Sequence, residues 1–345
     1  MDNGFITGHL KTSSGSIPMI STAWSRQDVW NTIKVRWSVG RMNYKVDPGI
    51  YAIGDPGENS YVFVTANFKL TFDIVRRALA GIDAWLLVLD TNGINVWCAA
   101  GKGTFSTNEL IRRIQSVDLD KTVNHHKIIV PQLGAVGVAA HEVKHATGFS
   151  VIYGPVRVAD IPAFIDAGLQ ATTEMRTVLF PLRERLKLVP VEMANGGYYL
   201  LLIPALLFIL SGINPHGYSF DIAYNDGLRS FFNLLVAYLS GCAITPVILP
   251  WLPFRRFSIK GLIVGLLAAL ILFYFHVLGQ NNLEVGSWFL MMGGLSSFLA
   301  MNFTGTSTFT SLSGVKKEMK KAVPLQIGMT GLGILAWIFS KFISL

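Results

Sequence analysis

The sequence predicts an α/β domain with a Rossmann-like arrangement, followed by an all-α transmembrane domain of five helices. Two observations support this prediction. Short apolar runs alternate with amphipathic helical patterns between residues 61 and 167, which is typical of a parallel sheet covered by helices. The chain carries 29 Lys and Arg and 21 Asp and Glu, yet only 13 of these charged residues lie in the last 148 positions. The mean hydropathy of +0.45 is accordingly too high for a typical soluble protein.

This change in composition divides the chain into three parts. Residues 1–18 are polar, and we expect them to be loosely ordered. Residues 19–190 form the α/β domain, and residues 191–345 form the transmembrane domain. Tryptophans are interleaved with basic residues between 19 and 55, but we interpret this part as a folded segment packed on the sheet, not as a nucleic-acid surface. No basic segment followed by an apolar run is present at the N-terminus, so the α/β domain is expected in the cytoplasm.

Four strand–helix pairs define the predicted sheet. Its strands are residues 61–64, 84–89, 127–130 and 150–153, and the helices that follow them are 72–80, 106–115, 137–144 and 161–167. The carboxyl ends of parallel strands meet at one edge, where open α/β sheets bind their ligands. A phosphate-binding G-x-G-x-x-G pattern is absent, which argues against a dinucleotide as that ligand.

Cys98 lies at this edge, in a loop predicted between the strand at 84–89 and the helix at 106–115. The unpaired N–H groups near a helix N-terminus favour negative charge, and Lys102 adds a cation, so the thiolate form should be favoured. The thiolate is also the form that binds a metal. The alternative is that Cys98 is a small apolar residue packed in a turn. The flanking Asn95, Gly101 and Gly103 instead indicate a loop with a functional role.

Five long stretches after residue 197 lack Asp, Glu, Lys and Arg, and each can cross a bilayer. They are 198–220, 230–254, 261–283, 285–315 and 322–340. Seven basic residues fall in the loops around 253–260 and 304–321, whereas the opposite side holds Arg229 and Lys341. The positive-inside rule therefore puts the N-terminus inside and the C-terminus outside. Buried charges are almost missing from these spans, which argues against an ion-coupled transporter.

The motif NVWCAAGK at positions 95–102 resembles the signature of the HgcA family, the corrinoid proteins of microbial mercury methylation. The resemblance extends through TAWS at 22–25, KVRW at 34–37, GRMNY at 40–44, VTAN at 64–67, PQLGA at 131–135 and YGPVR at 153–157. It continues into a membrane region of the expected size. The α/β domain is more distantly similar to the large subunit of the corrinoid iron–sulfur protein of acetyl-CoA synthesis.

The resemblance implies that the α/β domain binds a corrinoid of the cobalamin type in its base-off form, with Cys98 as the lower axial ligand of cobalt. Trp97 either packs against the corrin edge or belongs to the core. The candidate cofactor-binding residues are Thr65, Asn67, Thr71, Asn95, Val96, Trp97, Cys98, Ala99, Gly101, Lys102, Gln132, Leu133, Gly134, Ala135, Gly154, Pro155 and Arg157. Gly134 and Gly154 lack a Cβ atom and would let the backbone approach a large flat ligand.

The implied activity is methylation of Hg(II) to methylmercury. Hg(II) is an electrophile, so it needs a methyl group that brings electrons as a carbanion or radical, and a thiolate opposite that group donates electron density. The alternative function is a membrane-tethered corrinoid methyl carrier of one-carbon metabolism.

The resemblance also implies partners. The first is a ferredoxin-like protein with two [4Fe-4S] clusters, which would reduce cobalt and could deliver Hg(II). The second is a methyl donor, either a protein or a methylated folate. The chain has two cysteines, Cys98 and Cys242, too few for a Cys₄ iron–sulfur cluster of its own. The expected location is the cytoplasmic membrane, and no nucleic-acid partner is expected.

Overall fold

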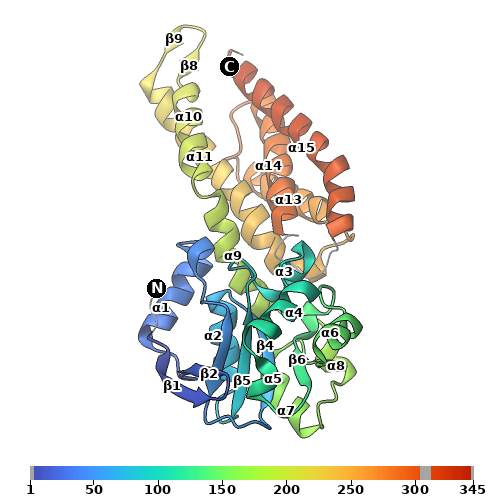
Figure 1. The fold of residues 1–345 in the computed structure, drawn as a ribbon. Coiled ribbons are helices and arrows are strands. Elements are labelled where there is room, and N and C mark those ends of the chain that lie inside the picture. The colour runs from blue at the N-terminus through green and yellow to red at the C-terminus, as the bar shows by residue number, and fades with distance from the viewer. Residues whose placement is uncertain (1–3, 304–311, 343–345) are drawn as a thin grey trace. The chain divides into compact units, whose positions relative to one another are not determined.

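The protein forms two compact units in a computed structural model that describes residues 4–303 and 312–342. One unit comprises the residues up to Val35 together with Val39–Leu179, and we call it the α/β unit. The other comprises Arg36–Ser38 and the residues from Phe180 onward, and we call it the helical unit. Figure 1 shows the elements of both.

The α/β unit is built on a seven-stranded mixed sheet with the strand order β1-β2-β3-β5-β4-β6-β7. Strands β4 to β7 are parallel to one another, as predicted, whereas β3 runs antiparallel to β5 and the β1–β2 hairpin adds an antiparallel edge. The strands are β1 (Ile6–Thr12), β2 (Gly15–Ile20), β3 (Gly49–Ile53), β4 (Tyr61–Ala66), β5 (Ala84–Leu89), β6 (Lys127–Val130) and β7 (Ser150–Tyr153).

Helices cover both faces of this sheet and bury a separate apolar core on each. Alternate residues of β5 divide between the cores: Trp85, Leu87 and Leu89 pack toward α3, α4, α5 and α6, while Leu86 and Val88 pack toward α2 and α7. The helices of this unit are α1 (Arg26–Arg36), whose last residue belongs to the helical unit, α2 (Lys69–Ala78), α3 (Val96–Lys102), α4 (Thr107–Ser116), α5 (Leu119–Thr122), α6 (Ala140–Thr147), α7 (Ile161–Asp166) and α8 (Thr173–Arg176). Short 3₁₀ turns are η1 (Arg41–Asn43), η2 (Gln132–Gly134) and η3 (Val158–Asp160).

Two predictions within this unit need correction. Residues 1–18 are not loosely ordered where the structure describes them, because residues 6–20 form the β1–β2 hairpin and bury Ile17 and Ile20. Residues 95–102 are not a loop either, since Val96–Lys102 is helix α3. Asn95 caps this helix: its side chain accepts a hydrogen bond from the Cys98 N–H at 2.9 Å.

A buried ion network joins α1 to α2. Asp73 accepts hydrogen bonds from Lys69 Nζ at 2.7 Å and Arg76 Nε at 2.8 Å, and Asp28 pairs with the same two cations at 3.1 and 3.0 Å. Burial raises the pKa of Asp28, but the hydrogen bonds from Ser25 and Lys69 outweigh it and lower the pKa to about 2. Asp28 is therefore ionised at neutral pH.

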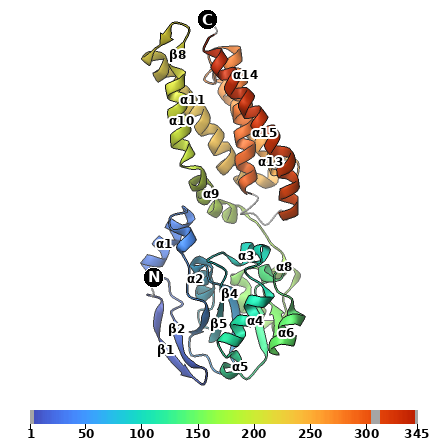
Figure 2. The same cartoon turned by 45° about the horizontal axis from the view of Figure 1, so that its top comes forward.

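The helical unit contains four helices long and apolar enough to cross a membrane in the described residues, or up to five if a bent pair counts as one span. Figure 2 shows α13, α14 and α15 side by side, and these helices pack directly on one another. The elements are α9 (Leu182–Gly196), α10 (Tyr199–Ser211), β8 (Ile213–Asn214), β9 (Gly217–Tyr218), α11 (Phe220–Leu239), the π-helical segment Ser240–Ile244, α12 (Thr245–Val247), the 3₁₀ turn Leu249–Trp251, α13 (Phe257–Tyr274), α14 (Asn282–Asn302) and α15 (Leu312–Ser340).

The predicted first span at 198–220 is not one helix. Helix α10 ends at Ser211, and the hairpin of β8 and β9 follows. Only α9 and α10 together, bent by 50° at their junction, reach the length of a span. The predicted fourth span at 285–315 also differs, because α14 ends at Asn302. Part of the predicted loop at 304–321 lies outside the described residues.

The helical unit also contains buried charges, at positions between or after the predicted spans. Asp226 and Glu284 are each paired with both Arg229 and Lys341, at distances between 2.7 and 3.3 Å. The four residues come from the first half of α11, the first turn of α14 and the position after α15. They lie up to 115 positions apart, so local sequence patterns do not reveal the pairing between helices. Two acids and two bases neutralise one another, and the network ties the three helices together at one end.

Candidate corrinoid site at the carboxyl edge of the sheet

Cys98 is the third residue of α3, and its side chain is half-buried and unpaired with the other cysteine. Asn95 fixes the first turn of the helix through its cap. Lys102 follows four positions later, so it lies on the same face of the helix as Cys98, and it is exposed. The helical spacing therefore supports the prediction that the Lys102 cation lies near the Cys98 thiol.

Asn67 organises the loop that leads from β5 to α3. Its side-chain oxygen accepts hydrogen bonds from the Thr91 N–H and hydroxyl and from the Gly93 N–H, all within 3.0 Å. Its amide nitrogen donates to Asp90 Oδ1 at 3.0 Å. Because Asn67 is buried and both ends of its amide are engaged, its role is to hold the loop before Cys98, and direct contact with a ligand is not needed to explain it.

Two polar atoms at the same edge have no hydrogen-bond partner among the described residues. They are Thr65 Oγ1, near the end of β4, and Gln132 Oε1, which follows β6. Strands β4 and β6 are neighbours, and α3 packs against both η2 and β4. An unpaired buried polar atom costs about 1–3 kcal/mol, so the edge beside α3 has unfilled hydrogen-bonding capacity that suits a polar ligand.

The glycines predicted to admit a flat ligand have another explanation. A Cβ atom on Gly134 would lie 2.5 Å from the Phe105 ring, and one on Gly154 would lie 3.0 Å from Ile129. A Cβ atom on Gly137 would lie 2.1 Å from the Phe105 carbonyl oxygen. Close packing inside the unit is therefore sufficient to account for these glycines, and their contact with a cofactor stays a prediction.

The remaining candidates fall on two faces of the sheet. Val96 and Ala99 point into the core beside α3, Leu133 packs against that core, and Gly101 is exposed. Trp97 and Ala135 are half-buried. Thr71 lies in the first turn of α2, which packs against η3 on the other face, near the exposed Arg157; Gly154 and Pro155 are buried. The structure thus brings residues 95–102 together with 132–135, whereas α2 and η3, beside which Thr71 and Arg157 lie, pack on the other core.

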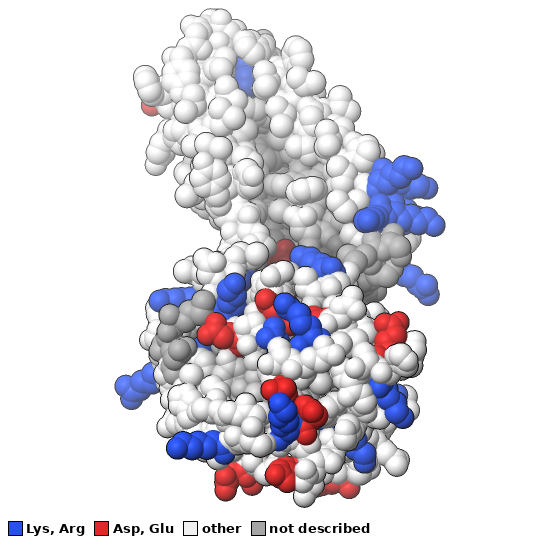
Figure 3. All heavy atoms as spheres, viewed as in Figure 1, with Lys and Arg blue, Asp and Glu red and all other residues white. Residues whose placement is uncertain are grey.

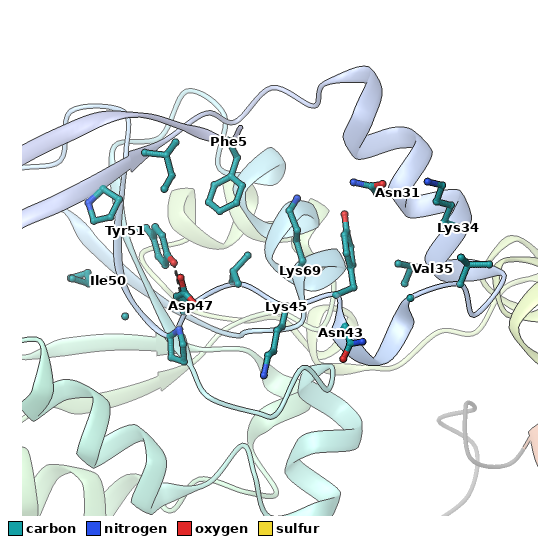
Figure 4. A pocket seen from close by; sticks show the side chains of 18 residues that line it. Phe5, Asn31, Lys34, Val35, Asn43, Lys45, Asp47, Ile50, Tyr51 and Lys69 are labelled. Carbon is teal, nitrogen blue, oxygen red and sulfur yellow. Dashed lines mark hydrogen bonds between the residues drawn. The ribbon is translucent and has the colours of Figure 1, made fainter. Parts of the chain in front are cut away.

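Sequence reasoning missed a cavity of about 650 Å³ in the α/β unit. Figure 4 shows Lys34, Lys45 and Lys69 at its wall together with Tyr51 and Asp47. The Tyr51 hydroxyl donates to the Asp47 carbonyl at 2.8 Å, and burial together with the Asp47 charge raises the pKa of Tyr51 to about 12. The residues that line this cavity lie between positions 5 and 69. In the sequence, only the segments 34–37 and 40–44, which belong to the family resemblance, indicated that this part of the chain is functional.

The α/β unit is similar in sequence to a known family and to several known proteins. Residues 22–165 match the family described as CO dehydrogenase/acetyl-CoA synthase delta subunit. The chain is 38% identical over 127 residues to the corrinoid/iron-sulfur protein large subunit of Moorella thermoacetica, covering 36% of this chain and 28% of that protein.

Two archaeal relatives give the same result. The acetyl-CoA decarbonylase/synthase complex subunit gamma of Methanopyrus kandleri is 38% identical over 124 residues, covering 35% of this chain and 26% of that protein. Its counterpart from Archaeoglobus fulgidus is 33% identical over 153 residues, covering 43% and 32%. The chain thus spans between a quarter and a third of these relatives. The more distant of the two resemblances noted in the sequence is confirmed.

Proposed function

We propose that the α/β unit binds a corrinoid beside α3 and that the chain takes part in methyl transfer at a membrane. Three observations support this proposal. A relative of this unit is named a corrinoid/iron-sulfur protein, Cys98 lies at the carboxyl edge of the sheet, and Thr65 and Gln132 have unfilled hydrogen-bonding capacity beside it. A bound corrinoid would supply a cobalt ion that receives and gives up a methyl group.

The residues of this chain would hold and orient that cofactor. Cys98 would bind cobalt through its sulfur, and the Asn95 cap would keep the first turn of α3 in place. Asn67 would preserve the loop before α3 through its four hydrogen bonds. Thr65 and Gln132 would bind the amide side chains of the corrin ring, because both carry buried oxygens able to accept a hydrogen bond.

Two functions in methyl transfer are compatible with this site. Similarity to a corrinoid/iron-sulfur protein and to a subunit of an acetyl-CoA decarbonylase/synthase complex favours the first candidate, a methyl carrier of one-carbon metabolism. The apolar helices would tether this carrier to the membrane. Cys98 favours the second candidate, methylation of Hg(II), since a thiolate ligand promotes transfer of a methyl group with its electrons. In either case a partner with iron–sulfur clusters would provide electrons, because Cys98 and Cys242 are the only cysteines.

Cofactor binding is tested by the optical spectrum of the full chain after reconstitution with cobalamin. We expect one corrinoid per chain, a spectrum with the nucleotide base displaced from cobalt, and a change in that spectrum in Cys98→Ala. The matched control is Cys242→Ala, whose spectrum should equal that of the parent. A preparation that binds no cobalt, or one in which the base stays coordinated, would contradict the proposal.

We also propose that the bent pair α9–α10 crosses the membrane once, which gives five spans with the α/β unit in the cytoplasm. Reporter fusions after residues 220, 257, 282, 315 and 345 should then read outside, inside, outside, inside and outside. The basic residues around Arg255 and Lys316 should lie inside, as the positive-inside rule requires. A cytoplasmic C-terminus would show that only four helices cross.

A further inference from the structure

A small cavity of about 180 Å³ lies between α13, α14 and α15 within the helical unit. Its lining has two chemical characters. Arg256, Lys317 and Lys321 provide cations, whereas Leu262, Leu325 and Met329 provide apolar surface. Such a combination at the end of membrane-spanning helices matches a lipid, whose charged headgroup and apolar chains are adjacent.

The buried side chain of Gln326 places an unpaired hydrogen-bond acceptor in the cavity. The Ser297 hydroxyl donates to the Ser258 carbonyl at 2.8 Å, so its own oxygen is left to accept the hydrogen bond from Gln326 Nε2, also at 2.8 Å. This fixes the orientation of the amide. Gln326 Oε1 is buried without a partner among the described residues, and it therefore needs a hydrogen-bond donor.

The charge around the cavity favours an anion. Among residues 4–303 and 312–342, none of Arg256, Lys317 and Lys321 forms an ion pair, so their charges are not neutralised by the protein. The single carboxylate in the lining, Glu318, accepts a hydrogen bond from the Ser258 N–H at 2.7 Å at the start of α13. Three cations face one carboxylate, which leaves an excess of positive charge.

Further cations and exposed apolar surface lie around the cavity. Arg255, Lys316 and Lys320 are exposed next to the lining residues. Figure 3 shows a group of Lys and Arg side chains on the surface of the helical unit. Only 17% of the apolar stretch of α15 that could cross a membrane is buried within the protein, so most of this stretch is available to acyl chains.

We propose that this cavity binds the headgroup of an anionic phospholipid of the phosphatidylglycerol type. The phosphate would lie among Arg256, Lys317 and Lys321, and a glycerol hydroxyl would donate to Gln326 Oε1. Acyl chains would run along Leu262, Leu325 and Met329. Phosphatidylcholine lacks both the net charge and the donor, and phosphatidic acid has the charge without the headgroup hydroxyl. This site is independent of the corrinoid site.

The test is native mass spectrometry of the full chain in detergent, titrated with phosphatidylglycerol, phosphatidic acid and phosphatidylcholine. The parent protein should prefer phosphatidylglycerol. Replacing two cavity cations in K317Q/K321Q should weaken its binding by about tenfold or more, since each basic residue near an anionic lipid contributes measurably to affinity. The matched control K316Q/K320Q removes the same charge outside the cavity and should change binding by less than about twofold.

A second variant tests the hydroxyl. Gln326→Leu should abolish the preference for phosphatidylglycerol over phosphatidic acid, and this ratio is measured within one protein, so partial unfolding does not mimic it. Equal losses in the two lysine pairs would overturn the proposal in favour of diffuse attraction. A preference that survives in Gln326→Leu would overturn the hydroxyl contact, and binding of free glycerol phosphate as tight as that of the lipid would overturn the lipid as occupant.

Discussion

Replacement of Cys98 by alanine is expected to abolish methyl transfer while leaving the protein folded and in the membrane. The side chain is half-buried in a capped helix, so its removal leaves the core intact, but it would remove the sulfur ligand of cobalt. Loss of groups that only support a metal ligand costs about 10–100-fold, and loss of the ligand itself should cost more. The assay is methylation of Hg(II) by cells that also make the proposed ferredoxin-like partner.

Cys242→Ala is the matched control. Cys242 is buried in the π-helical segment Ser240–Ile244 of the helical unit, where it is 1% exposed. Its substitution removes one sulfur from the same protein without touching the carboxyl edge of the sheet, so methyl transfer should stay close to the parent level. A comparable loss in both variants would point to a general effect of cysteine removal and not to a cobalt ligand.

Cys98→His separates the two proposed acceptors. Histidine can still bind cobalt, but as a neutral donor it provides less electron density than a thiolate. Transfer to Hg(II) should therefore fall sharply even when the corrinoid is bound, whereas transfer to a one-carbon acceptor such as a thiol should persist. Full Hg(II) methylation by Cys98→Ala would end the thiolate mechanism, and one-carbon transfer without Hg(II) methylation by the parent would favour the carrier.

The central strands could be predicted from sequence because they are buried on both faces. β5, which is fully buried, has the predicted bounds, since a parallel strand covered by helices reads as a continuous apolar run. β6 and the half-buried edge strand β7 also have the predicted bounds. The β1–β2 hairpin was missed for the opposite reason. In β1 every second residue is exposed, so His9, Lys11 and Thr12 make the segment look like a polar tail.

The candidate site was predictable only in part. Cys98, Asn95 and Gln132 belong to local motifs, and the structure brings their segments together at one edge. The function of Asn67 as a loop organiser depends on four hydrogen bonds to residues about 25 positions away, which no local pattern encodes. The cavity near Lys45 and the paired charges of the helical unit are likewise products of tertiary packing.

Arg76→Leu is expected to destabilise the α/β unit by about 3–5 kcal/mol, because it breaks a buried ion network by removing one partner. Arg76 is fully buried, and it donates to Asp73 at 2.8 Å and to Asp28 at 3.0 Å. It also donates to the backbone carbonyls of Ser21 and Ala23. After substitution Lys69 is the one cation of this network left to pair with the two carboxylates, and two carbonyls lose the hydrogen bonds from Arg76.

The measurement is thermal unfolding of the purified full chain at pH 7, where Asp28, with a pKa of about 2, is fully ionised. The control is Arg77→Leu, an exposed neighbour on the same helix that stacks on Trp24, and its cost should stay below about 1 kcal/mol. Arg76→Lys should fall between the two, since an ammonium keeps the charge but cannot reproduce four directed hydrogen bonds. Equal melting temperatures for Arg76→Leu and Arg77→Leu would mean that the network contributes nothing to stability, and that α1 is held to α2 by apolar contacts alone.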